Sequence, residues 1–425
     1  MRTKLTLLLC ALSLTACKVS EVKYQGPPNI LLIIADDMGK DATNGFSEGT
    51  IKPKTPHIDR IKDSGLSFHN FWTYATCSPT RASIITGKYG YRTGVNRVHQ
   101  LMKPTETILQ KYIKDNSSID YATAVVGKWH LAGKTNNTFN PENLGMDYYA
   151  GLIGGTVTDY NAWQLTQGGK VSLQTSYITR AFTDLAINWV NAQEKPWFLW
   201  LAYSAPHTPI HLPPSEMHSQ GELPPYEKGM DIMPYHTAMI ESLDYEIGRF
   251  LDSIPQNELA NTLIIFIGDN GTYAPAAQAP YSSDKAKGTL YQGGINNPMF
   301  VSGPGVLRRG IDHNLVTSTD LFATIAEIAG VAAKDTHDSK SFRHLFTDNR
   351  KHRNFQYCEM NDGTEKMWVI SNGRYKLFIH ADGKEEFYHL AEDPYEGNDL
   401  IGKTMTKKQL AAKNELVEEL GRIRN

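Results

Sequence analysis

Cysteine is scarce in this sequence, which has only four among its 425 residues. Cys10 and Cys17 lie close to the N-terminus, so Cys77 and Cys358 are the two in the body of the chain. Two cysteines cannot build the disulfide framework that stabilises small secreted domains. The residues leave open either a single disulfide between Cys77 and Cys358 or a separate chemical role for Cys77.

The sequence also lacks an excess of charge of either sign. Lysine and arginine total 43 and aspartate and glutamate total 45, a formal net charge of −2. A nucleic-acid-binding protein normally has a basic excess, so we expect no nucleic-acid partner. No repeat or low-complexity tract is visible. With 40% hydrophobic and 21% charged residues, the composition is typical of a folded globular chain.

No hydrophobic run in the sequence is long enough to cross a bilayer. The hydrophobic run near the N-terminus is typical of a signal peptide. Arg2 and Lys4 precede a short apolar stretch over residues 5–14. The stretch ends in Leu-Thr-Ala-Cys17, which resembles the lipobox of bacterial lipoproteins. The resemblance implies cleavage before Cys17, lipidation of Cys17, and a lipid anchor in the membrane of a bacterial cell envelope. An ordinary secretory signal with a chance cysteine is the alternative.

Four segments share one design, in which an apolar run is followed at once by polar residues. They span residues 30–35, 122–126, 197–203 and 263–267. Continuous apolar runs of this length are typical of parallel strands that are covered on both faces. Helical patterns lie between them, over residues 177–192 and 237–253. We therefore predict an α/β fold with a doubly wound, mostly parallel sheet flanked by helices.

The composition changes after about residue 340. Short strand-like segments at 366–370, 375–380 and 386–390 are separated by Asn-Gly and Asp-Gly pairs, which predicts antiparallel hairpins. An amphipathic helix follows, with its apolar positions at Leu410, Leu416, Val417, Leu420 and Ile423. We predict a signal peptide and lipobox at 1–17, a catalytic α/β domain at 18–340, and a small α+β subdomain at 341–425.

The segment from Cys77 to Arg81 predicts an anion-binding helix start. Ser78 is a good N-cap, Pro79 a good first helical residue, and Gly87 a good stop. Cys77 then lies at the N-terminus, with Arg81 one turn on. The helix dipole and the guanidinium both favour an anion there, such as a reactive thiolate. A buried structural cysteine before a capped helix fits this pentapeptide about as well.

Two pairs of oxygen-bearing side chains follow two of the predicted strands. The pairs are Asp36 with Asp37 and Asp269 with Asn270. Because ligands in such sheets bind beyond the carboxyl ends of the strands, the two pairs can converge on a hard cation such as calcium or magnesium. Acidic residues are also common where strands lead into loops and need not bind a metal. This alternative easily explains one such pair, but it explains two pairs less well.

A third set consists of basic side chains in loops near strand ends. Its members are Lys128, His130, His207 and Lys287. Lysines can bind a tetrahedral oxyanion, and histidines can exchange protons near neutral pH. Taken one at a time, each is more often a solvated lysine or a structural histidine.

Together these residues resemble the type I, formylglycine-dependent sulfatases of the alkaline phosphatase superfamily. The resemblance rests on Cys-Ser-Pro-Thr-Arg at 77–81 with Ile-Ile-Thr-Gly-Lys at 84–88, and on Gly-Lys-Trp-His-Leu at 127–131. Ala-Pro-His-Thr-Pro at 205–209 and Gly-Asp-Asn-Gly at 268–271 match further motifs in the expected order. The match extends from about residue 29 to 400.

The resemblance implies a sulfuric ester hydrolase in which a maturating, formylglycine-generating enzyme oxidises Cys77 to an aldehyde. One hydroxyl of its hydrate attacks the sulfate ester, and the other then expels sulfate. Calcium is implied as a cofactor that polarises the nucleophile. Asp36, Asp37, Asp269, Asn270 and modified Cys77 are the implied metal ligands.

The resemblance also implies roles for the basic residues. Arg81 positions the nucleophile, and Lys128 and Lys287 bind sulfate oxygens. His207 or one of these lysines protonates the leaving oxygen, while His130 accepts the proton that drives sulfate expulsion. His211 either lines the substrate pocket or is structural. The sequence departs from the family pattern at His57, Gln292 and Asn296, none of them a core catalytic position.

An envelope location favours sulfated carbohydrate as the substrate. Trp72 and Trp163 either stack on sugar rings or belong to the core. One alternative function is a phosphatase or phosphonate monoester hydrolase of the same superfamily, although the two-zinc members need further histidine ligands. The other is a non-catalytic glycan-binding lipoprotein, which we would expect to have lost Cys77, Arg81 or a metal ligand.

Overall fold

The computed structural model describes residues 26–332, 335–361 and 363–424. The predicted signal peptide and Cys17 lie outside the described residues, so the expectation of a lipid anchor stays a prediction. Within the described ranges, no helix has the length and the apolar content needed to traverse a membrane.

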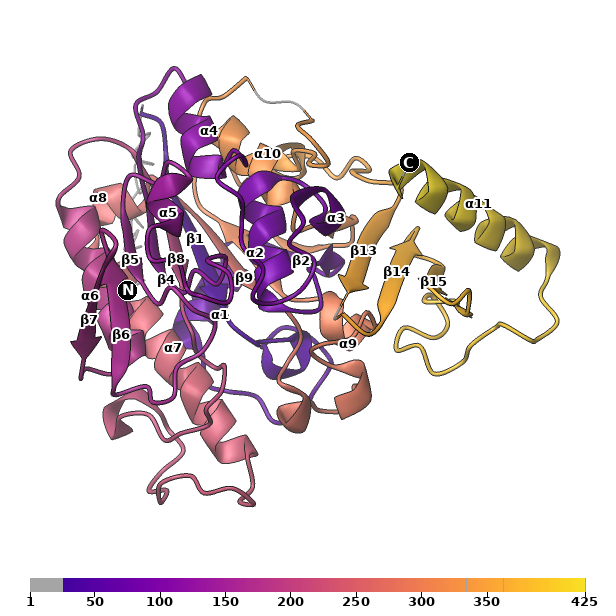
Figure 1. Cartoon of the computed structure of the whole chain (residues 1–425), viewed down its shortest axis with the longest axis horizontal. Helices are drawn as coiled ribbons and strands as arrows, with labels where there is room; N and C mark the ends of the chain where they lie inside the picture. Colours follow the sequence, from indigo (N-terminus) through magenta and orange to yellow (C-terminus); the bar gives the residue numbers. More distant parts are fainter. Residues whose placement is uncertain (1–25, 333–334, 362, 425) are drawn as a thin grey trace, which may run out of the picture.

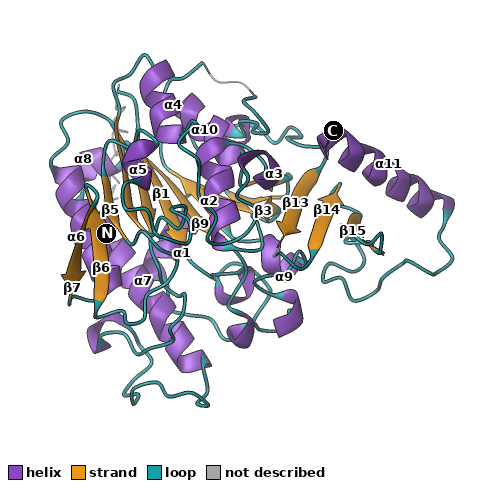
Figure 2. Ribbon diagram, in the orientation of Figure 1, coloured by secondary structure: helices purple, strands orange, loops and turns teal. Residues whose placement is uncertain are grey.

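The four predicted apolar segments form the centre of one ten-stranded sheet (Figure 2). In spatial order they are β9 (Thr262–Gly268), β1 (Asn29–Ala35), β8 (Trp197–Ala202) and β4 (Ala122–Gly127). Neighbours in this group pair in parallel, and every residue in the group is buried. Along β1, alternate side chains enter the two cores on opposite faces of the sheet. The prediction of a parallel centre covered on both faces is confirmed.

Short outer strands extend the sheet at both edges, and no sequence pattern had indicated them. Beyond β4 lie β5 (Tyr149–Gly151), β6 (Trp163–Gln167) and β7 (Lys170–Gln174). Beyond β9 lie β10 (Met299–Ser302), β2 (Leu66–Phe68) and β11 (Gly310–Asp312). β10 and the β6–β7 hairpin pair antiparallel, so the sheet is mixed at its margins. β3 (Phe71–Trp72) and β12 (Val316–Thr317) form a separate parallel pair.

Helices cover both faces of the sheet. One layer comprises α2 (Cys77–Thr86), α4 (Leu109–Asn116) and α10 (Asp320–Ile328), and the other α1 (Pro56–Asp63), α6 (Ile178–Asn191) and α7 (Met233–Ser253). The shorter helices are α3 (Gly90–Thr93), α5 (Asn140–Asn143), α8 (Gln256–Leu259) and α9 (Gln292–Ile295). Single 3-10 turns span Lys40–Ala42, Ser215–Met217, Ala274–Ala276, Ser283–Lys285 and Arg343–Phe346. The two predicted helices correspond to α6 and α7.

The C-terminal part forms a four-stranded antiparallel sheet at one side of the main body (Figure 1). Its strands are β13 (Gln356–Asn361), β14 (Lys366–Ser371), β15 (Lys376–His380) and β16 (Glu385–Tyr388), with helix α11 (Lys407–Arg424) packed against them. α11 buries Leu416 and Leu420 as predicted, together with Ala412. Leu410 and Val417 are instead 48% and 41% exposed, because the buried stripe is narrower than the apolar pattern.

A buried ion pair connects α10 to the segment before β13. Arg353 Nε donates to Asp320 Oδ2 at 2.8 Å, and neither side chain is more than 9% exposed. Replacing Arg353 by leucine leaves the Asp320 carboxylate buried with less compensation, so we expect a loss of about 3–5 kcal/mol in unfolding free energy. Urea denaturation measures it. The matched control is Lys111→Ala at the exposed Lys111–Asp115 pair, where we expect the unfolding free energy to fall by less than about 0.5 kcal/mol.

This ion pair should make stability depend on pH at the acid end. Burial by itself raises the pKa of Asp320, but Arg353 and His352 outweigh it and lower the pKa below its ordinary value. Because the pKa of Asp320 is lower in the folded state than in the unfolded state, its ionised form stabilises the fold. This stabilisation is complete above about pH 3.9, the pKa of an unfolded aspartate, and is lost as the pH falls further. Without Arg353 the effect of burial is less opposed, so the pKa of Asp320 is higher in the folded variant than in the wild type. The difference in unfolding free energy between the wild type and Arg353→Leu should therefore be largest near pH 7 and shrink as the pH falls, reaching its smallest value below about pH 4. An unchanged difference at pH 3 would contradict this assignment.

Candidate active site

Four polar side chains meet where β1 and β9 end. The two strands pair in parallel with Ala35 opposite Gly268, which brings Asp36 and Asp37 beside Asp269 and Asn270. The Asp37 backbone N–H donates to Asp269 Oδ1 at 3.2 Å, and Asn270 Nδ2 donates to Asp37 Oδ1 at 2.8 Å. All four residues are fully buried. The predicted convergence of these two pairs is present in the fold.

Cys77 is the first residue of α2, two residues earlier than the sequence predicts. Thr76, in extended conformation, occupies the N-cap position, and the Thr80 N–H donates to its carbonyl. The predicted Ser78 cap is wrong, because the Ser78 hydroxyl donates to the His130 carbonyl at 2.8 Å. The predicted stop at Gly87 is confirmed by its left-handed φ of 66°. Cys77 and Arg81 therefore lie one helical turn apart.

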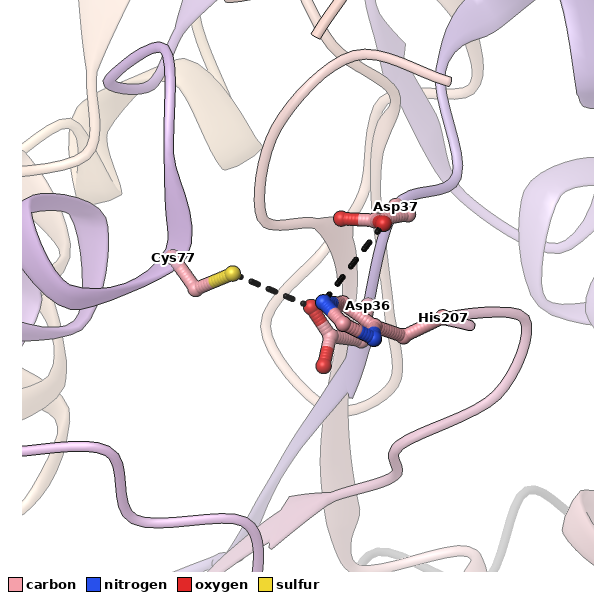
Figure 3. Close-up of side chains that lie close together, drawn as sticks. All are labelled: Asp36, Asp37, Cys77 and His207. Atoms are coloured by element: carbon pink, nitrogen blue, oxygen red, sulfur yellow. Dashed lines mark hydrogen bonds and ion pairs between the residues drawn. The ribbon is translucent and has the colours of Figure 1, made fainter. Parts of the chain in front are cut away.

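The Cys77 thiol lies against the carboxylate cluster (Figure 3). Its Sγ is 3.4 Å from Asp36 Oδ1 and 3.5 Å from Lys128 Nζ. Burial raises the pKa of Cys77, but Lys128 and Lys287 outweigh it and lower the pKa to about 6. Cys358 is also buried, and both thiols are free, so the possible Cys77–Cys358 disulfide is absent. Burial raises the pKa of Cys358.

Arg81 fixes the arrangement of the cluster. Its Nη1 donates to the Lys128 carbonyl at 2.8 Å and its Nη2 to Asp269 Oδ2 at 2.9 Å. Burial lowers the pKa of Arg81, but Asp269 outweighs it and raises the pKa, so the guanidinium stays charged. Arg81 thus joins α2 to the ends of β4 and β9.

Three further basic groups surround the aspartates. Lys128, which follows β4, forms an ion pair with Asp36. Lys287 Nζ lies 2.6 Å from Asp37 Oδ2. His207 Nε2 lies 3.8 Å from the same oxygen (Figure 3). With Arg81, the structure thus brings together four basic side chains and three carboxylates at the carboxyl edge of the sheet. Such a site can hold a cation among the carboxylates and an anion against the lysines.

The electrostatic balance differs between the aspartates. Burial raises the pKa of Asp37, but Lys287 and His207 outweigh it, so the pKa is lowered. Burial and the neighbouring Asp36 raise the pKa of Asp269 to about 6, against the opposing effect of Arg81. Crowded carboxylates of this kind are stabilised by a bound divalent cation.

The cluster contains a set of atoms that can hold a metal ion. Asp36, Asp37, Cys77 and His207 each offer a ligand atom within 4.8 Å of the others. Asn270 Oδ1 is buried and has no hydrogen-bond partner among the described residues. Such an orphaned acceptor is costly unless a ligand satisfies it. Sequence reasoning had not counted His207 among the possible ligands.

His130 lies beside this cluster, and the structure adds a neighbour that the sequence does not reveal. His130 Nε2 is 3.4 Å from His99 Nδ1. His99 belongs to none of the motifs, so no sequence signal could have found it. Burial, with Lys128 and Arg81, lowers the pKa of His130 well below its usual value, so its ring is neutral.

Three other candidates have structural surroundings. His211 packs between Tyr160 and Tyr177, with Nε2 3.1 Å from the Tyr177 hydroxyl and Nδ1 2.9 Å from the Pro209 carbonyl. With both ring nitrogens occupied, His211 fits the structural alternative. Trp72 and Trp163 are each 2% exposed and pack in hydrophobic clusters, which fits the alternative that they belong to the core.

The three departures from the family pattern have surroundings of their own. Gln292 and Asn296 are buried and line, with Lys40 and Trp72, a cavity of about 220 Å³. The His57 backbone N–H donates to Asp244 at the start of α1. The cavity lining includes none of the cysteine, lysine and histidine candidates described above.

Comparison with known proteins identifies the family. The model of the Sulfatase family matches residues 28–331, and the model described as "N-sulphoglucosamine sulphohydrolase, C-terminal" matches residues 284–425. An uncharacterized sulfatase of Escherichia coli is 27% identical over 368 residues, which are 74% of this chain and 64% of that protein. An arylsulfatase of Klebsiella aerogenes is 24% identical, covering 76% of this chain and 90% of that protein.

Solved structures agree with the sequence comparison. The crystal structure of Ps i-CgsB superposes on this chain with a TM-score of 0.78 and 26% sequence identity. The crystal structure of Ps i-CgsB in complex with k-i-k-neocarrahexaose superposes with a TM-score of 0.76 and 24% sequence identity. Each covers 93% of this chain and 92% of the other. On the family match over most of the chain and the shared fold, this protein belongs to the sulfatase family of the alkaline phosphatase superfamily.

Proposed function

We propose that this protein is a sulfuric ester hydrolase that uses calcium and a formylglycine made from Cys77. The observation that supports this best is the position of Cys77, at a helix N-terminus and 3.4 Å from Asp36 within the carboxylate and lysine cluster. The sulfatase family match is the second support. Release of free sulfate from sulfate esters by the matured protein tests the proposal.

Calcium suits this donor set because carboxylate and amide oxygens are the ligands that it prefers. Asp36, Asp37, Asp269, Asn270 and modified Cys77 would hold it, and the orphaned Asn270 Oδ1 supports this assignment. When bound, the ion polarises the nucleophile and neutralises sulfate oxygens.

The chain's own residues supply orientation and charge. Arg81, held by Asp269 and the Lys128 carbonyl, orients the side chain at position 77 one turn before it. Lys128 and Lys287 provide fixed positive charge for sulfate oxygens, which is usually the largest contribution to catalysis. His207, 8% exposed, donates a proton to the leaving oxygen, and neutral His130 accepts one. The formylglycine hydrate supplies the attacking hydroxyl.

Replacing Arg81 by lysine tests the orienting role. Lysine keeps the charge but cannot reach both the Lys128 carbonyl and Asp269 with one ammonium group. We expect kcat to fall by about 10²-fold or more while the fold is retained. Steady-state kinetics with circular dichroism measures this. The control is Arg92→Lys, at a partly exposed pair with Asp338, where no loss of kcat is expected. Full activity of Arg81→Lys would contradict the role.

Sulfated carbohydrate is the substrate class that we infer. Relatives named N-acetylgalactosamine-6-sulfatase and a structural neighbour bound to k-i-k-neocarrahexaose support it. A panel of sulfated mono- and oligosaccharides, scored for free sulfate, should give turnover of at least one member well above that of aryl sulfate. Aryl sulfate as the best substrate would argue against a carbohydrate specificity.

We further infer a lipid anchor at Cys17 in a bacterial envelope, and a maturating enzyme as a transient partner. The apolar N-terminal stretch and the Leu-Thr-Ala-Cys sequence support the anchor. In the native host, the protein should fractionate with membranes, and Cys17→Ser should release it. Co-fractionation that persists in Cys17→Ser would overturn the assignment.

A phosphonate or phosphate monoester hydrolase is the second candidate. Unmodified Cys77 and His207 are ligands that zinc prefers, and both belong to the group that can hold a metal. Rates on an aryl sulfate and an aryl phosphonate, measured side by side with metal analysis, distinguish the two. Calcium with a faster sulfate reaction supports the sulfatase; zinc with a faster phosphonate reaction supports the alternative.

A further inference from the structure

His99 lies at the edge of the active site, in direct contact with His130. Its Nδ1 is 3.4 Å from His130 Nε2, and the two ring centroids are 5.0 Å apart. His99 is exposed and follows α3, whereas His130 is buried and follows β4. The two histidines therefore meet through the fold, one on the solvent side and one on the side of the cluster.

The backbone at both histidines is held in an unfavourable conformation. His99 and His130 each have a φ of 61°, and Asp37 has a φ of 70°. These are three of the six non-glycine residues that the described ranges hold at positive φ. The left-handed region costs about 1–2 kcal/mol for a residue with a Cβ, so the surrounding structure must compensate for it. Strained residues of this kind concentrate at functional sites.

The ring of His130 has little freedom. A Cβ at Gly155 would lie 2.2 Å from His130 Nε2, so this part of the backbone packs directly on the imidazole. His130 Nδ1 is buried and has no hydrogen-bond partner among the described residues. Within the same residues, the contact with His99 is the one hydrogen bond found for the imidazole of His130.

A neutral imidazole has one N–H, and its position decides what the ring can do. With the hydrogen on Nε2, His130 donates to His99 Nδ1, and its Nδ1 keeps a free lone pair. With the hydrogen on Nδ1, His130 would bury an N–H group that has no acceptor. Buried donors without an acceptor are rarer in proteins than buried acceptors without a donor. The surroundings of His130 therefore favour the Nε2–H form.

We propose that His99 is a positioning residue that holds His130 in the Nε2–H tautomer, so that Nδ1 can accept a proton during sulfate-ester hydrolysis. This inference rests on the proposed function and extends it to a residue outside the family motifs. The second hydroxyl of the formylglycine hydrate loses its proton to Nδ1 as its C=O bond forms and the C–O bond to sulfate breaks, which releases sulfate. The product imidazolium still donates its Nε2–H to His99. The proton then passes to solvent and restores the neutral ring.

Nitrogen NMR of histidine-labelled protein tests the tautomer directly. The His130 signals are identified by their absence in His130→Gln. We expect the Nε2–H form in the wild type and a shift toward the Nδ1–H form in His99→Ala. His99→Asn should keep the wild-type form, because asparagine offers an acceptor oxygen and tolerates a left-handed backbone. The same His130 signals in His99→Ala as in the wild type, or a wild type in the Nδ1–H form, would overturn the proposal.

Kinetics supply the second readout. In His99→Ala we expect kcat to fall about 10- to 100-fold with KM within about twofold, and His99→Asn should restore most of kcat. Because His99 is exposed, His99→Asn should melt at the wild-type temperature. His99→Ala should melt slightly lower, because alanine is less tolerant of the left-handed backbone at this position. A raised KM with unchanged kcat would make His99 a substrate contact and overturn the proposal. If the matured wild type hydrolyses no sulfate ester, the proposed function fails, whereas the NMR result still decides the role of His99.

Discussion

Replacing Cys77 by alanine is expected to abolish sulfate-ester hydrolysis, with kcat/KM reduced by at least about 10⁴-fold. The loss is large because the remaining lysines and histidines can bind the sulfate but cannot attack it. Cys77 is fully buried against Asp36, and alanine fits the same space, so the fold should survive. The measurement is release of free sulfate by wild type and variant, both produced in a host that contains a maturating enzyme.

The matched control is Cys358→Ala, which removes the other buried thiol of the described residues. Cys358 lies on β13 in the C-terminal sheet, so we expect lower stability and unchanged kcat. Mass analysis of the Cys77 peptide should show conversion of its CH₂SH group to CHO in the wild type. Sulfate release that persists in Cys77→Ala would contradict the proposed mechanism, and a persistent thiol in fully active protein would contradict the modification.

Removal of calcium is expected to have the second largest effect, a loss of activity of about 10³-fold or more. Three carboxylates would then face each other around the nucleophile with only the basic side chains to compensate. Dialysis against a chelator, followed by addition of a single metal, measures the effect. Calcium should restore sulfate release and also raise the melting temperature, since a ligand that binds only the folded state stabilises it.

A ligand variant makes this test specific to the site. Asn270→Leu removes the orphaned Oδ1 at similar volume, and we expect it to raise the calcium concentration needed for half-maximal activity by about 10- to 100-fold. Asn44→Leu, at a partly buried amide that bonds Asp59, should leave that concentration unchanged. Full activity after exhaustive chelation, or restoration by zinc and not by calcium, would overturn the calcium assignment.

Much of the architecture could be predicted from local sequence. The strands at residues 30–35 and 263–267 are continuous apolar runs, and in a parallel sheet such runs must lie at the centre. Their carboxyl ends then coincide, which is why Asp36 and Asp269 could be placed together. The C-terminal hairpins were likewise indicated by glycine turns, at Gly373 and Gly383, both of which have positive φ.

Segments without a periodic pattern were not predicted. β2, β10 and β11 have three or four residues each, too few for a pattern, and they form because neighbouring strands offer unpaired backbone groups. The start of α2 was misplaced for a related reason. Ser78 is a good N-cap in isolation, but in the fold its hydroxyl is used by the distant His130 carbonyl.

The sequence by itself therefore determined the residue types of the site and their order along the chain, since motifs and strand ends are local features. The tertiary structure alone decided which side chains touch. It placed His207 among the possible metal ligands, enclosed His211 between tyrosines, buried Trp72 and Trp163, and set His99 against His130. These contacts join segments that are far apart in sequence, and packing and electrostatics across such distances leave no local pattern to read.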